Sequence, residues 1–225
     1  MDFMDKYIDR EHAGKLLANQ LSEYVNRSDV IILALPRGGV PVAYEVARKL
    51  SAPLDVFIVR KLGVPGHQEL AMGAIASGGN IVLNEELVAT FGIPESSIER
   101  VIEAEENELF RRESLYHVHG ALPDLHDKTI VLVDDGIATG ATMKVAIKAL
   151  RQKKPAKIIV AVPVAARDTC NEMAKLADQI VCPLKPISFY AVGLWYENFS
   201  QTSDDEVCTL LEKAYLERKD LDQAS

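Results

Sequence analysis

The stretch Val131-Leu-Val-Asp-Asp-Gly-Ile-Ala-Thr-Gly-Ala-Thr-Met143 decides the fold of this 225-residue chain. An apolar run of strand character ends in two adjacent carboxylates, Asp134 and Asp135, and a loop of small residues follows before a helical pattern begins. Carboxylates at a strand end can hold ribose hydroxyls or a hydrated Mg²⁺, and small residues let backbone N–H groups close around a phosphate at a helix N-terminus. The stretch therefore predicts a site for a ligand that carries both a sugar diol and a phosphate.

Outward from this stretch, buried strands alternate with helical patterns. Apolar runs predict strands over 30–35, 54–59, 129–133, 158–162 and 179–181, and helical periodicity predicts helices at about 11–26, 40–50, 141–153 and 168–176. Continuous apolar strands that alternate with helices indicate a parallel sheet covered on both faces. We therefore expect an α/β fold, built as one domain over 1–225.

Two segments depart from this rhythm. Between residues 61 and 128 the chain is rich in glycine, with a short strand predicted at 81–83 and a long charged helix at about 94–118. This insertion is too long for a simple crossover and is either a lid with a flexible loop or a small subdomain. The segment 183–200 is rich in aromatics and prolines, and a last helix at about 204–218 is expected to pack back on the body.

Composition narrows the class of protein. The chain is 48% hydrophobic and 26% charged, as globular domains are, and its net charge of −8 argues against nucleic acid and anionic membranes as partners. Three scattered cysteines without a CxxC motif do not make a disulfide framework or a zinc site, which favours a reducing cytoplasm. The N-terminus lacks the apolar core of a signal peptide, and no uncharged apolar run approaches the ~18 residues of a membrane span.

Two more loops follow predicted strands, at the edge where such sheets bind ligands. The first, Pro36-Arg-Gly-Gly39, combines a planar guanidinium with glycines that permit close approach to a phosphate. The second, Arg60-Lys61, adds two cations. Taken singly, these loops also fit a turn, a solvated strand end and a helix cap, whereas their combination favours a ligand with a diphosphate at one end and a monophosphate at the other. Neither a Walker A motif nor a GxGxxG fingerprint is present.

The segment Val131–Met143 resembles the 5-phosphoribosyl-1-diphosphate (PRPP) binding motif of type I phosphoribosyltransferases, and the Pro-Arg-Gly-Gly loop resembles that family's diphosphate loop, which often carries a cis peptide that does not precede proline. The resemblance covers roughly residues 30–182. The chain as a whole looks like a stand-alone bacterial group of this family that shares the Pro-Arg-Gly-Gly, Arg-Lys-Leu-Gly and Glu-Leu-Ala-Met-Gly-Ala-Ile-Ala stretches. This resemblance implies a parallel-sheet core with a lid insertion at 61–128 and a C-terminal hood at 183–200.

The resemblance also implies a role for each matching residue. Asp134 and Asp135 would bind the ribose 2′ and 3′ hydroxyls and position Mg²⁺, directly or through water, and with Arg37 they form the expected catalytic set. The 5-phosphate would bind along Gly136, Ile137, Ala138, Thr139, Gly140, Ala141 and Thr142. The diphosphate would bind to Arg37, Gly38 and Gly39, assisted by Arg60 or Lys61.

One departure from the family bears on the acceptor. In the 6-oxopurine enzymes an aspartate matches Ala138, where it acts on the purine N7 proton, and a lysine matches Ala141. Both positions are alanine here, so the loop looks more like that of the adenine or uracil enzymes.

The acceptor and lid residues are less sharply indicated. Phe189, Trp195 or Tyr196 of the hood could stack on a planar base, and they fit equally well as hood core. Arg111 and Arg112 could act as closing cations of a lid, against the alternative of a solvated helix with i,i+4 pairs such as Glu108–Arg112. A further possibility is His67, as an acid or base on the insertion.

These features predict an enzyme of nucleotide salvage that transfers the phosphoribosyl group from PRPP, with Mg²⁺, to a nitrogen nucleophile such as a nucleobase-like heterocycle, and releases diphosphate. The alternative is a PRPP-binding sensor or regulator without turnover. A PRPP synthase is disfavoured because nothing in the chain is duplicated. Dimers are common in the family, so a homodimer is possible.

Overall fold

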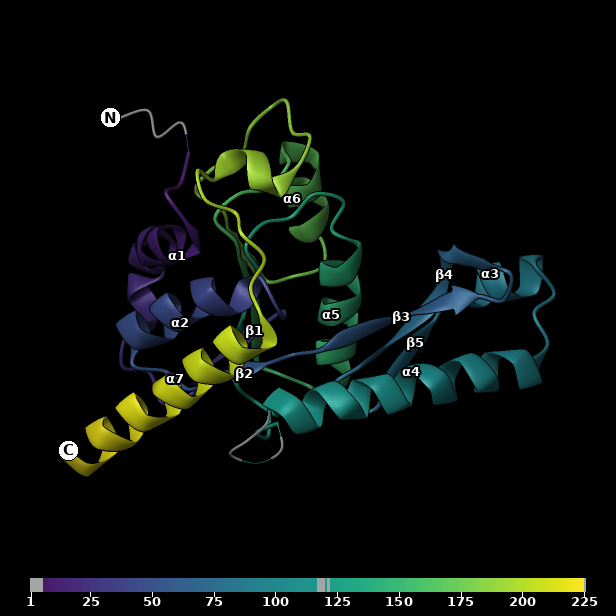
Figure 1. The fold of residues 1–225 in the computed structure, drawn as a ribbon, viewed down its shortest axis with the longest axis horizontal. Helices are drawn as coiled ribbons and strands as arrows, with labels where there is room; N and C mark the ends of the chain where they lie inside the picture. The colour runs from purple at the N-terminus through teal and green to yellow at the C-terminus, as the bar shows by residue number, and fades with distance from the viewer. Residues whose placement is uncertain (1–5, 117–119, 121, 225) are drawn as a thin grey trace.

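The computed structural model describes residues 6–116, 120 and 122–224. Its centre is a five-stranded parallel sheet in the order β2-β1-β6-β7-β8 (Figure 1), which confirms the predicted α/β fold. The strands are β1 (Val30–Ala34), β2 (Leu54–Val56), β6 (Thr129–Val133), β7 (Lys157–Ala161) and β8 (Gln179–Val181). Every residue of β1 and β6 is buried, as their continuous apolar sequences predict for strands covered on both faces.

Helices cover the two faces of this sheet. Alternate strand residues point to opposite faces, so Ile32 and Val131 join one core and Leu33 and Leu132 the other. The first core packs under α1 (Arg10–Asn19), the 3₁₀ turn η1 (Ser22–Tyr24), α2 (Gly39–Leu50) and α7 (Asp204–Ala224); the second packs under α5 (Ala141–Gln152) and α6 (Arg167–Met173). The last helix extends beyond the predicted residue 218.

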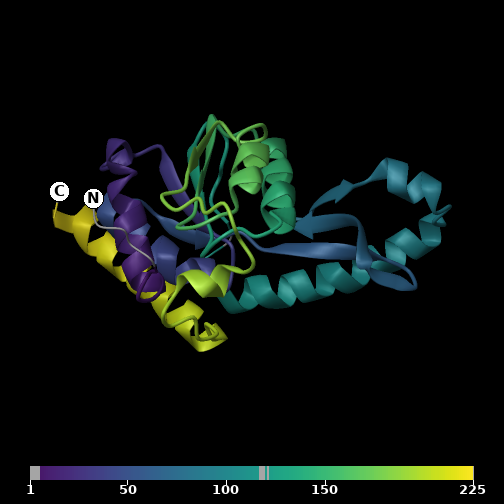
Figure 2. The same cartoon turned by 90° about the horizontal axis from the view of Figure 1, so that it is seen from above.

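Residues 59–116 form a projecting arm. It consists of β3 (Val59–Val64), β4 (His67–Ala76), β5 (Asn80–Leu83), α3 (Glu85–Thr90) and α4 (Glu95–Tyr116). The three strands make an antiparallel sheet that projects from the central sheet, and α4 runs beneath it back to the body (Figures 1 and 2). The strand predicted over 54–59 is wrong in extent, because β2 ends at Val56 and the arm begins at Val59. Of the predicted long helix, residues 117 and 118 lie outside the described part.

The start of the described chain pairs with the hood. The N–H of Tyr7 donates to the carbonyl of Trp195 at 2.8 Å, and the N–H of Glu197 donates back to the carbonyl of Tyr7 at 2.8 Å. Tyr7, Ala13, Val164 and Tyr196 form a third small core beneath η2 (Val192–Trp195). The hood is therefore held by a segment almost two hundred positions away, next to the carboxyl edge of the sheet. In the described residues no helix combines the length and apolar character needed to cross a membrane.

Candidate functional site

The acidic pair lies at the carboxyl end of the central strand β6. Asp134 and Asp135 are largely enclosed, and the backbone N–H of Asp135 donates to Oδ1 of Asp134 at 2.9 Å. The Nε of Arg10, at the start of α1, donates to Oδ2 of Asp135 at 2.8 Å, and both of these side chains are mostly buried. The structure thus pairs one carboxylate of the motif with a cation and leaves the other beside it.

Burial shapes the ionisation of this pair. Loss of hydration raises the pKa of Asp134 well above its ordinary value, and the neighbouring charge of Asp135 raises it further. Burial also raises the pKa of Asp135, while the guanidinium of Arg10 opposes that shift. Two carboxylates this close in a dry environment favour a ligand that brings compensating hydrogen-bond donors or positive charge.

We expect Asp134→Asn to stabilise the folded protein near pH 8 by about 1 kcal/mol, the common size of a stabilising substitution. The folded-state pKa of Asp134 lies above its unfolded value, so the folded state binds more protons and loses stability as pH rises above about 4. Asparagine removes that penalty and keeps an oxygen for the Asp135 N–H. Thermal unfolding should show a gain of about 2–4 °C at pH 8 that shrinks towards pH 4. A variant less stable than wild type at pH 8 would contradict this account of the charge.

The loop after the acidic pair is tightly packed at its start and open at its end. A Cβ on Gly136 would lie 2.5 Å from the side chain of Val192, and the N–H of Ile137 donates to the carbonyl of Val164 at 2.9 Å. Gly140 has φ +73°, a conformation natural to glycine. Beyond the buried Gly136 and Ile137, the residues Ala138, Thr139, Ala141 and Thr142 are exposed.

Helix α5 begins directly from this loop without a side-chain cap at Gly140. The Oγ1 of Thr169 on α6 donates to the carbonyl of Ala138 at 2.7 Å, which fixes the loop from behind. The first N–H groups of a helix lack partners within the helix, and the helix dipole adds positive potential there. The uncapped end of α5 is therefore suited to an anion such as a phosphate.

The Pro-Arg-Gly-Gly loop lies against the acidic pair. It follows β1, the neighbour of β6, and its Pro36–Arg37 peptide is cis, as the resemblance leads one to expect. A Cβ on Gly38 would lie 2.1 Å from Oδ2 of Asp135, and one on Gly39 would lie 2.8 Å from the carbonyl oxygen of Val133. Helix α2 starts here, and its first N–H groups, those of Gly39 and Val40, donate to the carbonyls of Leu35 and Arg37 at 3.1 Å. The glycines are thus needed for the close approach of two loops.

Arg37 itself points to the junction of three elements. Its Nη1 lies 3.7 Å from Oδ1 of Asp204, the first residue of α7, and the hydroxyl of Tyr116, the last residue of α4, donates to the same carboxylate. Burial and this hydrogen bond raise the pKa of Tyr116. The base of the arm and the start of α7 therefore meet the loop that was predicted to bind diphosphate.

The other predicted cations lie on the arm. Arg60 is on β3, where its Nη2 lies 2.6 Å from Oε2 of Glu105, and Lys61 is exposed on the next position. Glu105 precedes the end of α4 by about 16 Å along the helix axis, at 1.5 Å per residue. The structure does not bring Arg60 and Lys61 together with Arg37.

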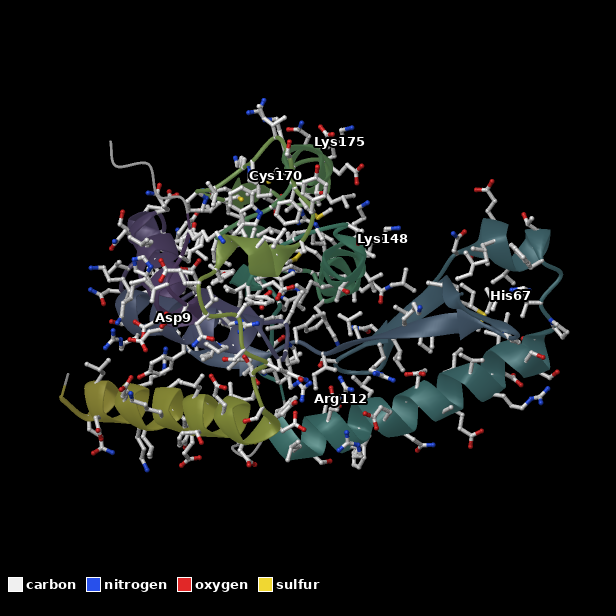
Figure 3. All side chains as sticks on the ribbon, turned by 45° about the horizontal axis from the view of Figure 1, so that its top comes forward. Asp9, His67, Arg112, Lys148, Cys170 and Lys175 are labelled. Atoms are coloured by element: carbon white, nitrogen blue, oxygen red, sulfur yellow. The ribbon has the colours of Figure 1, made fainter. Side chains whose placement is uncertain are left out.

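The predicted lid residues are paired along α4. Arg111 Nε lies 2.8 Å from Glu108 Oε2, and Arg112 Nε lies 2.9 Å from Glu108 Oε1, so the i,i+4 pair expected from the sequence is present. The two guanidinium groups lower the pKa of Glu108 to about 2. His67 lies at the outer part of the arm, far from the sheet edge in Figure 3.

The hood aromatics have two different environments. Phe189 and Trp195 are partly exposed and stacked, with ring centroids 6.3 Å apart and planes at 17°. Tyr196 is only 3% exposed; it packs on Tyr7 and Phe199, and its hydroxyl donates to the backbone carbonyl of Asp135 at 2.6 Å. The structure therefore places Tyr196 in the hood core, where its ring has no open face for a base, and leaves Phe189 and Trp195 as the predicted stacking residues.

Sequence reasoning missed Arg10, Tyr7 and Asp204. Arg10 contacts Asp135 across 125 positions, and neither Tyr7 nor Asp204 lies in a recognisable motif. The only local signal near Arg10 is Asp9, which caps α1 by accepting from the N–H of His12. That signal marks a helix start and does not reveal what the first helical residue contacts.

The sequence matches known phosphoribosyl transferases over most of its length. The family model described as a phosphoribosyl transferase domain matches residues 7–194. Two proteins of Mycobacterium tuberculosis, provisionally named phosphoribosyl transferases MT0597 and Rv0571c, are each 44% identical over 212 residues, or 94% of this chain. The chain spans about half of their length, 48%.

Among solved structures, the protein TT1426 from Thermus thermophilus superposes with a TM-score of 0.81 at 37% sequence identity. The superposition covers 92% of this chain and 98% of that one, so the likeness extends beyond the central sheet. Because the family model spans most of the sequence, and because this relative is matched almost end to end, the chain belongs to the phosphoribosyl transferase domain family, a family of transferase enzymes.

Proposed function

We propose that this protein transfers the phosphoribosyl group of PRPP to a nitrogen atom of a small heterocycle and releases diphosphate. One observation carries the proposal: α5 begins without a side-chain cap directly after the acidic pair, and the Pro-Arg-Gly-Gly loop, with Arg37 and Gly38, lies against that pair. The uncapped start of α5 suits the 5-phosphate, the guanidinium of Arg37 suits the diphosphate, and the carboxylates suit the ribose hydroxyls. PRPP carries its two phosphate groups at opposite ends of a ribose ring, so its charge distribution matches this arrangement.

The reaction breaks the bond between the anomeric carbon and diphosphate, whose oxygen keeps the electron pair, and forms a bond from the acceptor nitrogen to that carbon. Positive charge develops on the ribose ring and negative charge on the departing diphosphate. Asp134 and Asp135 would hold the ring hydroxyls, and Arg37 with the N–H group at Gly38 would stabilise the leaving group. The N–H of Gly39, predicted to help here, already donates to the carbonyl of Leu35 at 3.1 Å. The proton of the acceptor nitrogen passes to a general base.

The donor set at this edge fits Mg²⁺. The metal prefers oxygen ligands and keeps several waters, so a site with two carboxylates and substrate oxygens suits it better than a site built wholly from protein. The described part of the chain holds no cluster of three or more histidine, cysteine or acidic residues that would bind a metal by itself. We propose that Asp134 and Asp135 hold Mg²⁺ directly or through water, and that the metal neutralises charge on the diphosphate when bound.

The 5-phosphate would lie in the open loop after the acidic pair. The N–H groups from Ala138 to Thr142 and the hydroxyls of Thr139 and Thr142 line that loop, and Ala138, Thr139 and Thr142 are exposed. Gly136 and Ile137, predicted to bind the phosphate too, are buried, and the N–H of Ile137 donates to the carbonyl of Val164. Ala138 offers no carboxylate for the N7 proton of a 6-oxopurine, which favours acceptors of the adenine or uracil type. The stacked pair of Phe189 and Trp195 is the proposed contact for a planar acceptor.

Exclusion of water from the site would protect PRPP from hydrolysis. The insertion at 61–128 keeps its proposed role in closure, with Arg111 and Arg112 as its cations, because α4 ends beside the loop that carries Arg37. In the present arrangement Arg60 and Lys61 lie on the arm, so their assistance to the diphosphate would require the arm to move.

Release of diphosphate from Mg²⁺–PRPP in the presence of purines, pyrimidines and pyridine carboxylates tests the proposal, with mass spectrometry to identify the nucleotide product. We expect at least one heterocycle to give a ribonucleotide together with diphosphate. Adenine or uracil should exceed hypoxanthine and guanine, because the loop lacks the aspartate that acts on N7. Tight PRPP binding without product from any acceptor would favour a PRPP-binding sensor or regulator instead. Absence of PRPP binding would rule out both the transferase and the sensor.

A further inference from the structure

Arg10 makes three contacts that converge on the candidate site. Its Nε donates to Asp135 Oδ2 at 2.8 Å, its Nη1 donates to the carbonyl of Ser200 at 2.7 Å, and its guanidinium carbon lies 4.0 Å from the ring centroid of Phe199. Only 12% of its side-chain surface is exposed. Because the guanidinium makes contacts through two of its nitrogens and one face, its orientation is fixed. A lysine ammonium cannot make this set of contacts.

The Asp135 carboxylate is held in place by its neighbours. Arg10 contacts its Oδ2. Gly38 lies beside the same oxygen, because a Cβ there would lie 2.1 Å from Oδ2 and 3.4 Å from Nε of Arg10. Arg10 and the Pro-Arg-Gly-Gly loop therefore both limit the position of this oxygen.

The same arginine ties the hood to the acidic pair. Tyr196 donates to the backbone carbonyl of Asp135, and its ring packs on Phe199, which lies under the guanidinium of Arg10. The segment just before Arg10 pairs with the hood through the hydrogen bonds between Tyr7 and both Trp195 and Glu197. Hood position and carboxylate orientation are therefore set by one connected group of contacts.

We propose that Arg10 is a positioning residue of the sugar-phosphate site. It orients Asp135 towards the ligand and fastens the hood beside the acidic pair, and this role rests on the proposed function. Groups that orient a ligand-binding side chain through a hydrogen bond commonly change affinity or activity by about 10- to 100-fold when they are removed. Arg10 would therefore act on PRPP binding without touching PRPP.

The test compares Arg10→Gln and Arg10→Lys with a matched control, Arg27→Gln. Arg27 also bridges an aspartate, with Nη2 2.7 Å from Asp29 Oδ2, and also lies over an aromatic ring, that of Tyr24, but it stands before β1 at the opposite edge of the sheet. Titration calorimetry with Mg²⁺–PRPP gives the affinity. Emission of Trp195, the single tryptophan of the chain, reports the hood, and thermal unfolding checks that each variant is folded.

We expect Arg10→Gln to weaken PRPP binding at least about tenfold and to shift the Trp195 emission. Arg10→Lys keeps the charge and should recover only part of the affinity, while Arg27→Gln should stay within about twofold of wild type in both readouts. Two results would overturn the role of Arg10 and leave the proposed function standing. One is wild-type PRPP affinity in a folded Arg10→Gln variant, and the other is a loss of PRPP affinity in Arg27→Gln as large as that in Arg10→Gln. Absence of PRPP binding by the wild type overturns the proposed function and this inference with it.

Discussion

Replacement of Asp134 and Asp135 together by asparagine is expected to lower binding of Mg²⁺–PRPP and release of diphosphate by about a thousandfold. The two carboxylates are the anionic oxygen donors at the end of β6, close to the uncapped start of α5. Asparagine keeps the shape and the oxygen that accepts from the Asp135 N–H, but a neutral amide holds neither Mg²⁺ nor a developing positive charge comparably. Calorimetry and a diphosphate-release assay measure the two losses.

The control for this double variant is Glu85→Gln with Glu86→Gln on α3 of the arm. It also neutralises two adjacent acidic residues, so it changes the net charge of the chain equally. Binding should stay close to wild type in the control. If PRPP affinity survives in the Asp134→Asn, Asp135→Asn variant, the acidic pair does not hold the sugar, and the assignment of the whole loop falls with it.

The central sheet could be predicted from the sequence because its signals are local. β1 and β6 are short, wholly apolar runs, and burial on both faces is what such runs require. The parallel arrangement predicts that their loops leave the same edge of the sheet, whereas the pairing of β1 with β6, which puts the Pro-Arg-Gly-Gly loop next to the acidic pair, is a long-range contact that the sequence does not predict. The proximity of the two loops is seen in the contacts of Gly38 and Gly39.

The arm could not be predicted in the same way. β3 and β4 contain Gly63 and Gly73, and the register between them shifts at Gly63, so the alternation that marks a strand is interrupted. Arg60 follows an apolar run and was therefore expected at the sheet edge with Arg37. It lies instead on β3, where it pairs with Glu105, because the chain leaves the central sheet after Val56.

Long-range contacts set the remaining parts of the site. Arg10 meets Asp135 and Tyr7 meets the hood across stretches for which a single sequence carries no pairing signal. The same limit applies to Tyr196. A tyrosine suits both a stacking position and a core position, and only the packing of Tyr7 and Phe199 on the ring of Tyr196 decides between the two.

Gly38→Ala is expected to reduce the affinity for Mg²⁺–PRPP by about a hundredfold with little change in the fold. Gly38 has φ −59° and ψ −29°, which alanine adopts without backbone strain, so the new Cβ acts only through its surroundings. That Cβ would lie 2.1 Å from Oδ2 and 2.8 Å from Cγ of Asp135, and the short side chain cannot withdraw while Arg10 holds it. A displacement of about 1 Å in a positioned group is enough for a loss of this size.

The matched control for this substitution is Gly66→Ala in the arm. Gly66 has φ +80°, and a Cβ at this position would meet no described atom within 4 Å, so alanine there costs about 1–2 kcal/mol of backbone strain without touching the site. We therefore expect Gly66→Ala to lower the free energy of unfolding and to keep the PRPP affinity. Gly38→Ala should keep most of the free energy of unfolding and lose PRPP affinity. Wild-type affinity in Gly38→Ala would mean that Asp135 can leave its place beside Arg10 without consequence, and that the contact between the two loops does not set the geometry of binding.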